Sequence, residues 1–170
     1  MSPQDTYMTV PYNRERAVSY ARRWALSRNP RFYNFTGMGG DCANFASQCL
    51  YKGAGVMNYK PLYGWYYNSP NDRTPSWSGV KYLYNFLVGN QGIGPWATEA
   101  DIVEVQPGDI IQLALYLPEF QHTLVVVEAG EVPTPENTLI AAHSYDALDR
   151  PVQSYEYQKI RCLHIEGVRK

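Results

Sequence analysis

The sequence of 170 residues has no long apolar run, no excess of basic residues and no segment that resembles a signal peptide. No apolar run approaches the roughly 20 residues that a helix needs to cross a bilayer, so we expect no insertion into a membrane. The 15 Lys and Arg residues are balanced by 16 Asp and Glu residues, and the net charge of −1 lacks the basic field of a nucleic-acid binder. The segment "MSPQDTYMTV" has no charged stretch followed by an apolar one, so it does not resemble a signal peptide.

Cysteine is also scarce, since the chain has only Cys42, Cys49 and Cys162. The first two lie on one expected helix, about 10 Å apart along its axis. A disulfide needs Cα atoms within roughly 7 Å, so we expect no disulfide framework and at least one free thiol. No C-x2-C or H-x3-H pair is present, and we expect neither a metal site nor a cofactor.

The first half of the chain has helical patterns. Asn13 is a plausible N-cap for a first helix that ends at Asn29. Asp41 is the expected N-cap of a second helix over residues 42–51, with Gly53 just past its end. A third helix is expected over residues 78–88.

The second half of the chain has strand-like patterns. Apolar runs that follow a turn at residues 107–109 predict strands over residues 110–117, 122–130, 138–143 and 159–167. Helices first and strands second is the pattern of an α+β fold with an antiparallel sheet or a small barrel. No repeat or long linker divides the chain, so we expect one domain over residues 1–170, in which residues 1–11 form an N-terminal extension.

Cys42 follows the stretch "GMGGD" and opens the second expected helix. A thiol in the first turn of a helix meets the positive end of the helix dipole, which lowers its pKa when a histidine assists. The N–H groups of that turn are also suited to stabilise an oxyanion. Asp41 is expected to cap the helix and to border the substrate site, whereas Cys49 and Cys162 are expected to be buried.

Two histidines lie at the ends of neighbouring expected strands. His122 begins the strand "HTLVVV", and His143 ends the strand "TLIAAH", with Asp146 three residues later. If these strands pair antiparallel, the start of one lies beside the end of the other, and the two histidines meet at one edge of the sheet. A base and an orienting group at such an edge are what an activated cysteine requires. His164 lies inside the last strand and is expected to be structural.

Aromatic residues make up 14% of the chain, and many fall between residues 59 and 96. An exposed share of them would suit a groove for sugars or extended peptides, and packing in the core is the equally weighted alternative. The candidates for contact with a substrate are Trp65, Tyr66 and Trp77.

Seven blocks in this order, among them "GGDCANFASQCLYKGAG", "PGDIIQL", "HTLVVV" and "AAHSYDALDRPVQSY", resemble the putative amidase domain family of bacteria, a branch of the papain-like cysteine hydrolases. The resemblance runs from about residue 12 to residue 167. It implies a papain-like fold with Cys42 as nucleophile and His122 as general base. By similarity to cell-wall endopeptidases with a Cys-His-His set, His143 is the first choice for the third polar residue, and Asp146 is the alternative.

The function that this resemblance implies is cysteine-dependent cleavage of amide bonds through a thioester, in cell-wall peptides or related substrates. Two alternatives remain: acyl transfer by the same residues, and a peptide- or glycan-binding module without catalysis. We expect a monomer. The location is open, because the sequence as it stands favours the cytoplasm, whereas a domain of a longer protein could act at the cell wall.

Overall fold

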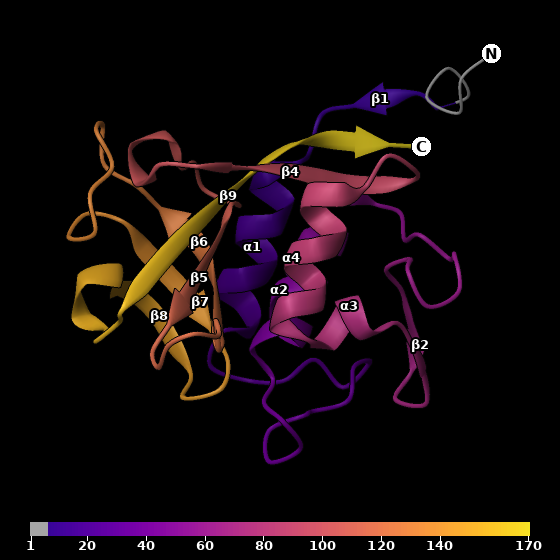
Figure 1. The fold of residues 1–170 in the computed structure, drawn as a ribbon, viewed down its shortest axis with the longest axis horizontal. Coiled ribbons are helices and arrows are strands. Elements are labelled where there is room, and N and C mark those ends of the chain that lie inside the picture. Colours follow the sequence, from indigo (N-terminus) through magenta and orange to yellow (C-terminus); the bar gives the residue numbers. More distant parts are fainter. Residues whose placement is uncertain (1–6) are drawn as a thin grey trace.

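The structure, a computed structural model, describes residues 7–170 and is an α+β fold (Figure 1). Its helical elements are α1 (Arg14–Trp24), α2 (Cys42–Ala54), α3 (Pro75–Ser78), α4 (Val80–Gly89) and the short 3-10 helices η2 (Ile102–Glu104) and η3 (Val152–Ser154). Its strands are β1 (Thr9–Val10), β2 (Tyr67–Ser69), β3 (Asp72–Arg73), β4 (Gly94–Ala100), β5 (Ile110–Ala114), β6 (His122–Glu128), β7 (Leu139–Ala142), β8 (Ala147–Pro151) and β9 (Lys159–Arg169).

One antiparallel sheet organises the chain. Its strands follow the order β1-β9-β5-β6-β7-β8, and β4 also pairs with β9. The long strand β9 therefore joins the N-terminal strand β1 to the middle of the sheet, and β2 and β3 form a separate hairpin. Part of the expected N-terminal extension is thus a strand of the sheet, and residues 1–6 lie outside the described residues.

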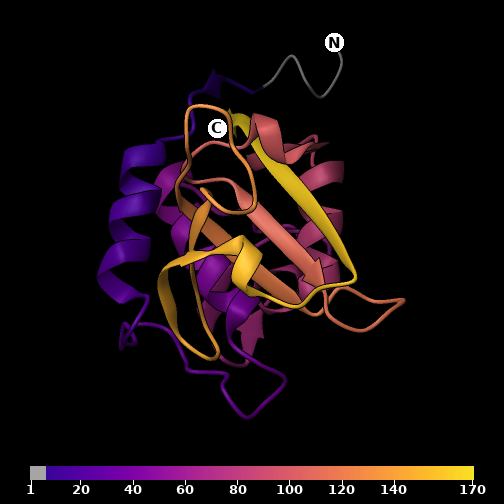
Figure 2. The same ribbon diagram turned by 90° about the vertical axis from the view of Figure 1, so that its left-hand side faces the viewer.

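The helices and the sheet form two layers. In Figure 1, α1, α2 and α4 stand side by side, and strands β5–β8 lie to their left; Figure 2 views the sheet from that side. One core cluster lies between helices and sheet and contains residues such as Phe45, Leu50, Val125 and Leu163. A second cluster, with Leu124, Val126, Ile140 and Val152, covers the other face. Strands β5 and β6 are consequently buried on both faces, which fits their continuous apolar sequences.

The expected helices are present with shifted ends. Asn13 caps α1 as predicted, because its side chain accepts a hydrogen bond from the backbone N–H of Arg16 (3.0 Å). Gly53, expected beyond α2, lies inside it, where any side chain would collide with the ring of Tyr12. The helix ends instead at Gly55, whose φ of +76° is the left-handed conformation that glycine adopts most readily.

The third expected helix is divided into α3 and α4 at Gly79, whose extended backbone interrupts the helical path. Strands β4 and β8 were not expected from the sequence. Neither has a run of apolar residues, and both contain a proline and charged side chains.

The two tryptophans expected in a substrate groove lie in the core instead. Trp65 and Trp77 are both 0% exposed and lie 5.0 Å apart between ring centroids. The Nε1–H of Trp65 donates to Ser47 Oγ and that of Trp77 to Asn44 Oδ1, so their polar atoms are satisfied inside the protein. These rings therefore have no surface to offer a substrate, and the alternative of core packing holds for them.

No helix among residues 7–170 combines the length and the apolar character needed to cross a membrane.

Candidate functional site

Cys42 is the first residue of α2, as expected, and follows a loop whose backbone only glycine adopts readily. Gly37, Gly39 and Gly40 all have φ between +88° and +100°. These glycines let the chain turn sharply from the exposed residue Met38 into the buried start of the helix. The sequence "GMGGDC" therefore specifies a tight approach to the N-terminus of α2, where the first backbone N–H groups of the helix have no partner within the helix.

The thiol of Cys42 lies against the beginning of β6. Its Sγ atom is 3.8 Å from the carbonyl oxygen of Gln121, the residue just before His122. The backbone and the side chain of Thr123 also form hydrogen bonds with this sulfur and lower the thiol pKa. Burial is the larger effect, and together with the charge of Asp41 it raises the pKa of Cys42 above its ordinary value. The side chain is only 8% exposed, so the group in this structure is a protonated thiol and not the exposed thiolate that the helix position suggested.

His122 begins β6 as expected, but its ring turns to the opposite face of the sheet from Cys42. Thr123 and Val125 face the helices, so the alternation of a strand sends His122 and Leu124 to the other face. The His122 imidazole lies 5.6 Å from the ring of Tyr155, centroid to centroid. Burial, and secondly the positive charge of Arg150, lower the pKa of His122 to about 4, so its imidazole is neutral near pH 7.

His143 follows β7 and lies on the helix side of the sheet, where it is almost completely buried. Its Nδ1 is 2.7 Å from Asp41 Oδ2, and its Nε2 is 2.8 Å from the carbonyl oxygen of Trp24. Its ring stacks on Phe45, 4.0 Å between centroids, one turn of α2 beyond Cys42. His143 is therefore joined to the residue that precedes the thiol.

Asp41 does not cap α2 with its side chain, contrary to the expectation. Its Oδ1 accepts hydrogen bonds from the backbone N–H of Phe35 and from Asn44 Nδ2, both at 2.8 Å, while its Oδ2 faces His143. The carboxylate is 0% exposed, and these hydrogen bonds outweigh its burial and lower its pKa. In this state Asp41 has no surface with which to contact a substrate.

Asp146 is held by an arginine that the sequence did not single out. Arg28 donates to both carboxylate oxygens of Asp146, at 2.8 and 2.9 Å. The same guanidinium lies 3.4 Å from Asp41 Oδ2 through its Nε, as an ion pair without hydrogen-bond geometry, and its Nη1 lies 3.2 Å from His143 Nε2. Arg28, Asp41, His143 and Asp146 thus form one charged cluster behind Cys42.

The two histidines lie at the same end of the sheet, as expected, but their rings do not meet because they lie on opposite faces of it. Strands β6 and β7 pair antiparallel, with Val125 opposite Ala141, and this register brings His122 and His143 to the same end of the sheet. Their rings lie on opposite faces, and among residues 7–170 no hydrogen bond joins His122 to Cys42, His143 or Asp146. The structure therefore brings Cys42, Asp41 and His143 together and leaves His122 adjacent through its backbone.

Exposed apolar side chains lie on the three segments that meet at Asp41 and Cys42. The segment before the helix carries Met38, the β5–β6 loop carries Tyr116, and the turn after β7 carries Tyr145, which are 67%, 78% and 95% exposed. Ser144 Oγ accepts from the backbone N–H of Asp41 (3.1 Å), which fixes that turn beside the start of α2. These three residues, unlike the buried tryptophans, have apolar surface open to solvent. Tyr66, the third aromatic candidate, is partly exposed, and its hydroxyl donates to Asp72 Oδ1 (3.3 Å).

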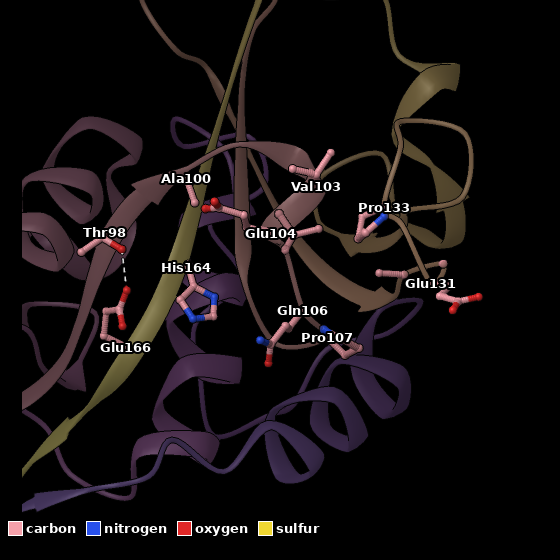
Figure 3. A pocket seen from close by; sticks show the side chains of 13 residues that line it. Thr98, Ala100, Val103, Glu104, Gln106, Pro107, Glu131, Pro133, His164 and Glu166 are labelled. Carbon is pink, nitrogen blue, oxygen red and sulfur yellow. Dashed lines mark hydrogen bonds between the residues drawn. The ribbon is translucent and has the colours of Figure 1, made fainter.

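Two cavities lie elsewhere. One of about 1220 Å³ is lined by residues of the segment 57–64 and of α4, such as Tyr59, Tyr63 and Tyr82. The other, of about 600 Å³, is lined by His164, Glu104 and Glu166 among others (Figure 3). Among the described residues, no group of three or more His, Cys, Asp or Glu side chains is arranged to hold a metal ion.

Sequence reasoning missed Thr123 and Arg28. Thr123 could have been found, since it follows His122 and the alternation of a strand gives one of the two residues to the helix side. No signal pointed to Arg28, because its partners in the cluster, Asp41, His143 and Asp146, lie 13 to 118 residues away in the chain.

Comparison with known proteins assigns the chain to a protein family. The model of the family described as "Putative amidase domain" matches residues 11–165, and the chain belongs to that family. A curated relative, the uncharacterized protein YhbB of Bacillus subtilis, is 33% identical over an alignment of 153 residues, and the match covers 85% of this chain and 45% of the relative. The chain thus spans less than half of that relative's length. No solved structure matches the chain.

Proposed function

We propose that this chain is a cysteine-dependent amide hydrolase with a papain-like arrangement, in which Cys42 is the nucleophile and His122 the general base. The observation that carries the proposal is the position of the thiol in a chain of an amidase family: Cys42 begins α2, and its sulfur lies against the residue that precedes His122 on β6. A helix start opposite a strand that carries a histidine supplies the parts of an activated cysteine.

The directions of the Cys42 and His122 pKa shifts support a mechanism in which the thiol proton moves to His122 as the sulfur attacks the substrate. The pKa of Cys42 is raised and that of His122 is lowered, so the resting pair is a thiol and a neutral imidazole. A neutral imidazole is a base that can accept the thiol proton. To do so, the His122 ring must leave Tyr155 and approach the sulfur. His122 is the first residue of β6, where the side chain is less confined than inside the strand.

The reaction follows from these groups. His122 takes the proton of Cys42, the sulfur attacks the carbonyl carbon of an amide, and N–H groups of the first turn of α2 stabilise the oxyanion. The C–N bond then breaks, and the leaving amine takes the proton from His122. Water attacks the resulting thioester, releases a carboxylic acid and restores the thiol.

The substrate class that we propose is the peptide part of the bacterial cell wall. It follows from the resemblance to cell-wall endopeptidases. The exposed apolar side chains of Met38, Tyr116 and Tyr145, on the segments that meet at Asp41 and Cys42, are suited to contact an extended peptide.

The test is digestion of peptidoglycan fragments, released by a muramidase from bacterial sacculi, with mass spectrometry of the products. We expect new amine and carboxyl ends with the wild-type protein and none with Cys42→Ala. His122→Gln should retain the fold and lose at least 100-fold in rate, which is the usual contribution of a general base. Equal cleavage by Cys42→Ala and the wild type would refute the proposal.

A further inference from the structure

The environment of His143 determines how many protons its ring carries. Its Nδ1 faces a carboxylate oxygen of Asp41 and its Nε2 faces the carbonyl oxygen of Trp24, at 2.7 and 2.8 Å. Carboxylate and carbonyl oxygens only accept hydrogen bonds, so both nitrogens must donate. Arg28 Nη1 also lies near Nε2, but at the longer distance of 3.2 Å, and it donates instead to Asp146 and to the carbonyl oxygen of Ser27. Two acceptor oxygens facing the two ring nitrogens form the hydrogen-bonding arrangement that an imidazolium satisfies.

An imidazolium at position 143 would balance the charges of its neighbours. Asp41 lies beside His143, and Asp146 is paired with Arg28, so with His143 protonated two positive groups face two negative groups and the cluster has no net charge. The other titratable side chains at this position are the thiol of Cys42, which follows Asp41, and the hydroxyl of Tyr20 on α1, which donates to Gln48. Without the imidazolium, one negative charge would remain unbalanced next to the thiol.

We propose that His143 is a positioning residue that acts on Cys42 through Asp41: its imidazolium neutralises the buried carboxylate that would otherwise oppose formation of the Cys42 thiolate. In this role His143 does not orient His122, and it touches neither the substrate nor the reacting sulfur. Asp41 in turn fixes the start of α2, because it binds Phe35 and Asn44 with its other oxygen. The proposal rests on the proposed function in one respect, that Cys42 is the nucleophile.

A second contact between a histidine and a buried aspartate, that of His164 with Asp109, serves as a control for His143 and Asp41. His164 Nδ1 lies 2.9 Å from Oδ2 of the buried Asp109, so it makes the same kind of contact. Asp109 precedes β5, and its carbonyl oxygen accepts a hydrogen bond from the backbone N–H of Val126 on β6. Val126 lies three residues beyond Thr123, a distance of about 10 Å along the strand. His164 itself lines the cavity of Figure 3, on the face of the sheet away from the helices. Replacing His164 should leave Cys42 unaffected.

The test is the pH profile of iodoacetamide alkylation at Cys42, resolved by peptide mass spectrometry. Glutamine at position 143 can still donate a hydrogen bond to Asp41 but has no charge. Adjacent residues place the carboxylate about 6 Å from the sulfur, where an unbalanced charge in an effective dielectric near 20 shifts a pKa by one to two units, less what Arg28 compensates. We expect the profile of His143→Gln to move by about one unit to higher pH, which is a tenfold slower reaction at pH 7.

Two further variants separate charge from structural damage. Asp41→Asn combined with His143→Gln removes both charges and should return the rate at pH 7 to within about threefold of wild type. His164→Gln should give the wild-type profile. The buried thiols of Cys49 and Cys162 should stay unmodified, which shows that each variant is folded.

An unshifted profile in folded His143→Gln, or a double variant as slow as the single one, would overturn the proposal. If His143→Gln exposes Cys49 and is thus unfolded, Asp41→Asn alone decides. A profile moved to lower pH supports the role of the Asp41 charge, and one that stays in place or moves to higher pH contradicts it. Because alkylation needs no substrate, a shifted profile without any amide cleavage would retain this role of His143 and reject the proposed function.

Discussion

Protonation of His122 should make the protein less stable as the pH falls, by an amount that the structure lets us work out. Burial and Arg150 lower the pKa of His122 from 6.5 to about 4 in the folded protein. The unfolded chain therefore binds this proton first, and stability is lost as the pH falls from about 6.5 to about 4. A shift of this size is worth about 3 kcal/mol in total, of which about 2 kcal/mol is lost between pH 7.5 and pH 5.0.

The assay compares urea unfolding of the wild type and His122→Gln at these two pH values. Other groups titrate in the same range in both proteins, so only the difference between their losses reports on His122. We expect the wild type to lose about 2 kcal/mol more than the variant. NMR titration of the ring, assigned by its disappearance in the variant, should give a midpoint near 4. A midpoint near 6.5 and equal losses would refute the burial of His122 against Tyr155 and the reasoning built on it.

Other predictions concern packing and the surface near the thiol. Gly53→Ala should destabilise the fold by about 1–3 kcal/mol in urea unfolding, because the new methyl group collides with the buried ring of Tyr12, whereas Gly89→Ala has open space and should be neutral or stabilising by up to about 1 kcal/mol. Stability of Gly53→Ala equal to that of Gly89→Ala would count against this packing. Trp77→Ala should cost about 3–5 kcal/mol as a core truncation. Tyr116→Ala and Tyr145→Ala should change stability by less than about 0.5 kcal/mol. If these two rings contact the substrate, both variants should raise KM at nearly constant kcat, and an unchanged KM would assign them no part in binding.

Much of the fold follows from local patterns in the sequence. Asn13 caps α1, Cys42 begins α2, and the four apolar runs of the second half form β5, β6, β7 and β9. These features depend on neighbouring residues, through capping and the periodicity of apolar side chains, so a single sequence contains them. Strand β4 could not be predicted in this way, because its pairing with β9 and not its own composition makes it a strand.

The site was less predictable, for two physical reasons. Strand β6 is apolar on both faces, so its sequence has no alternation that would tell which face His122 occupies. The partners of His143 come from two other parts of the chain, Asp41 and the carbonyl group of Trp24, and only tertiary structure brings them together. The register that joins the ends of β6 and β7 could be predicted, but the direction of each side chain could not.

The central claim, that Cys42 attacks an amide, is tested most directly by trapping its thioester. Muramidase-released peptidoglycan fragments would be mixed with the protein, quenched in acid within one turnover, and the peptide containing Cys42 examined by mass spectrometry. The account predicts an acyl adduct on Cys42 that hydroxylamine removes, less of it in His122→Gln, and none on Cys49 or Cys162. Amide cleavage that proceeds without an adduct, and equally well in Cys42→Ala, would contradict it.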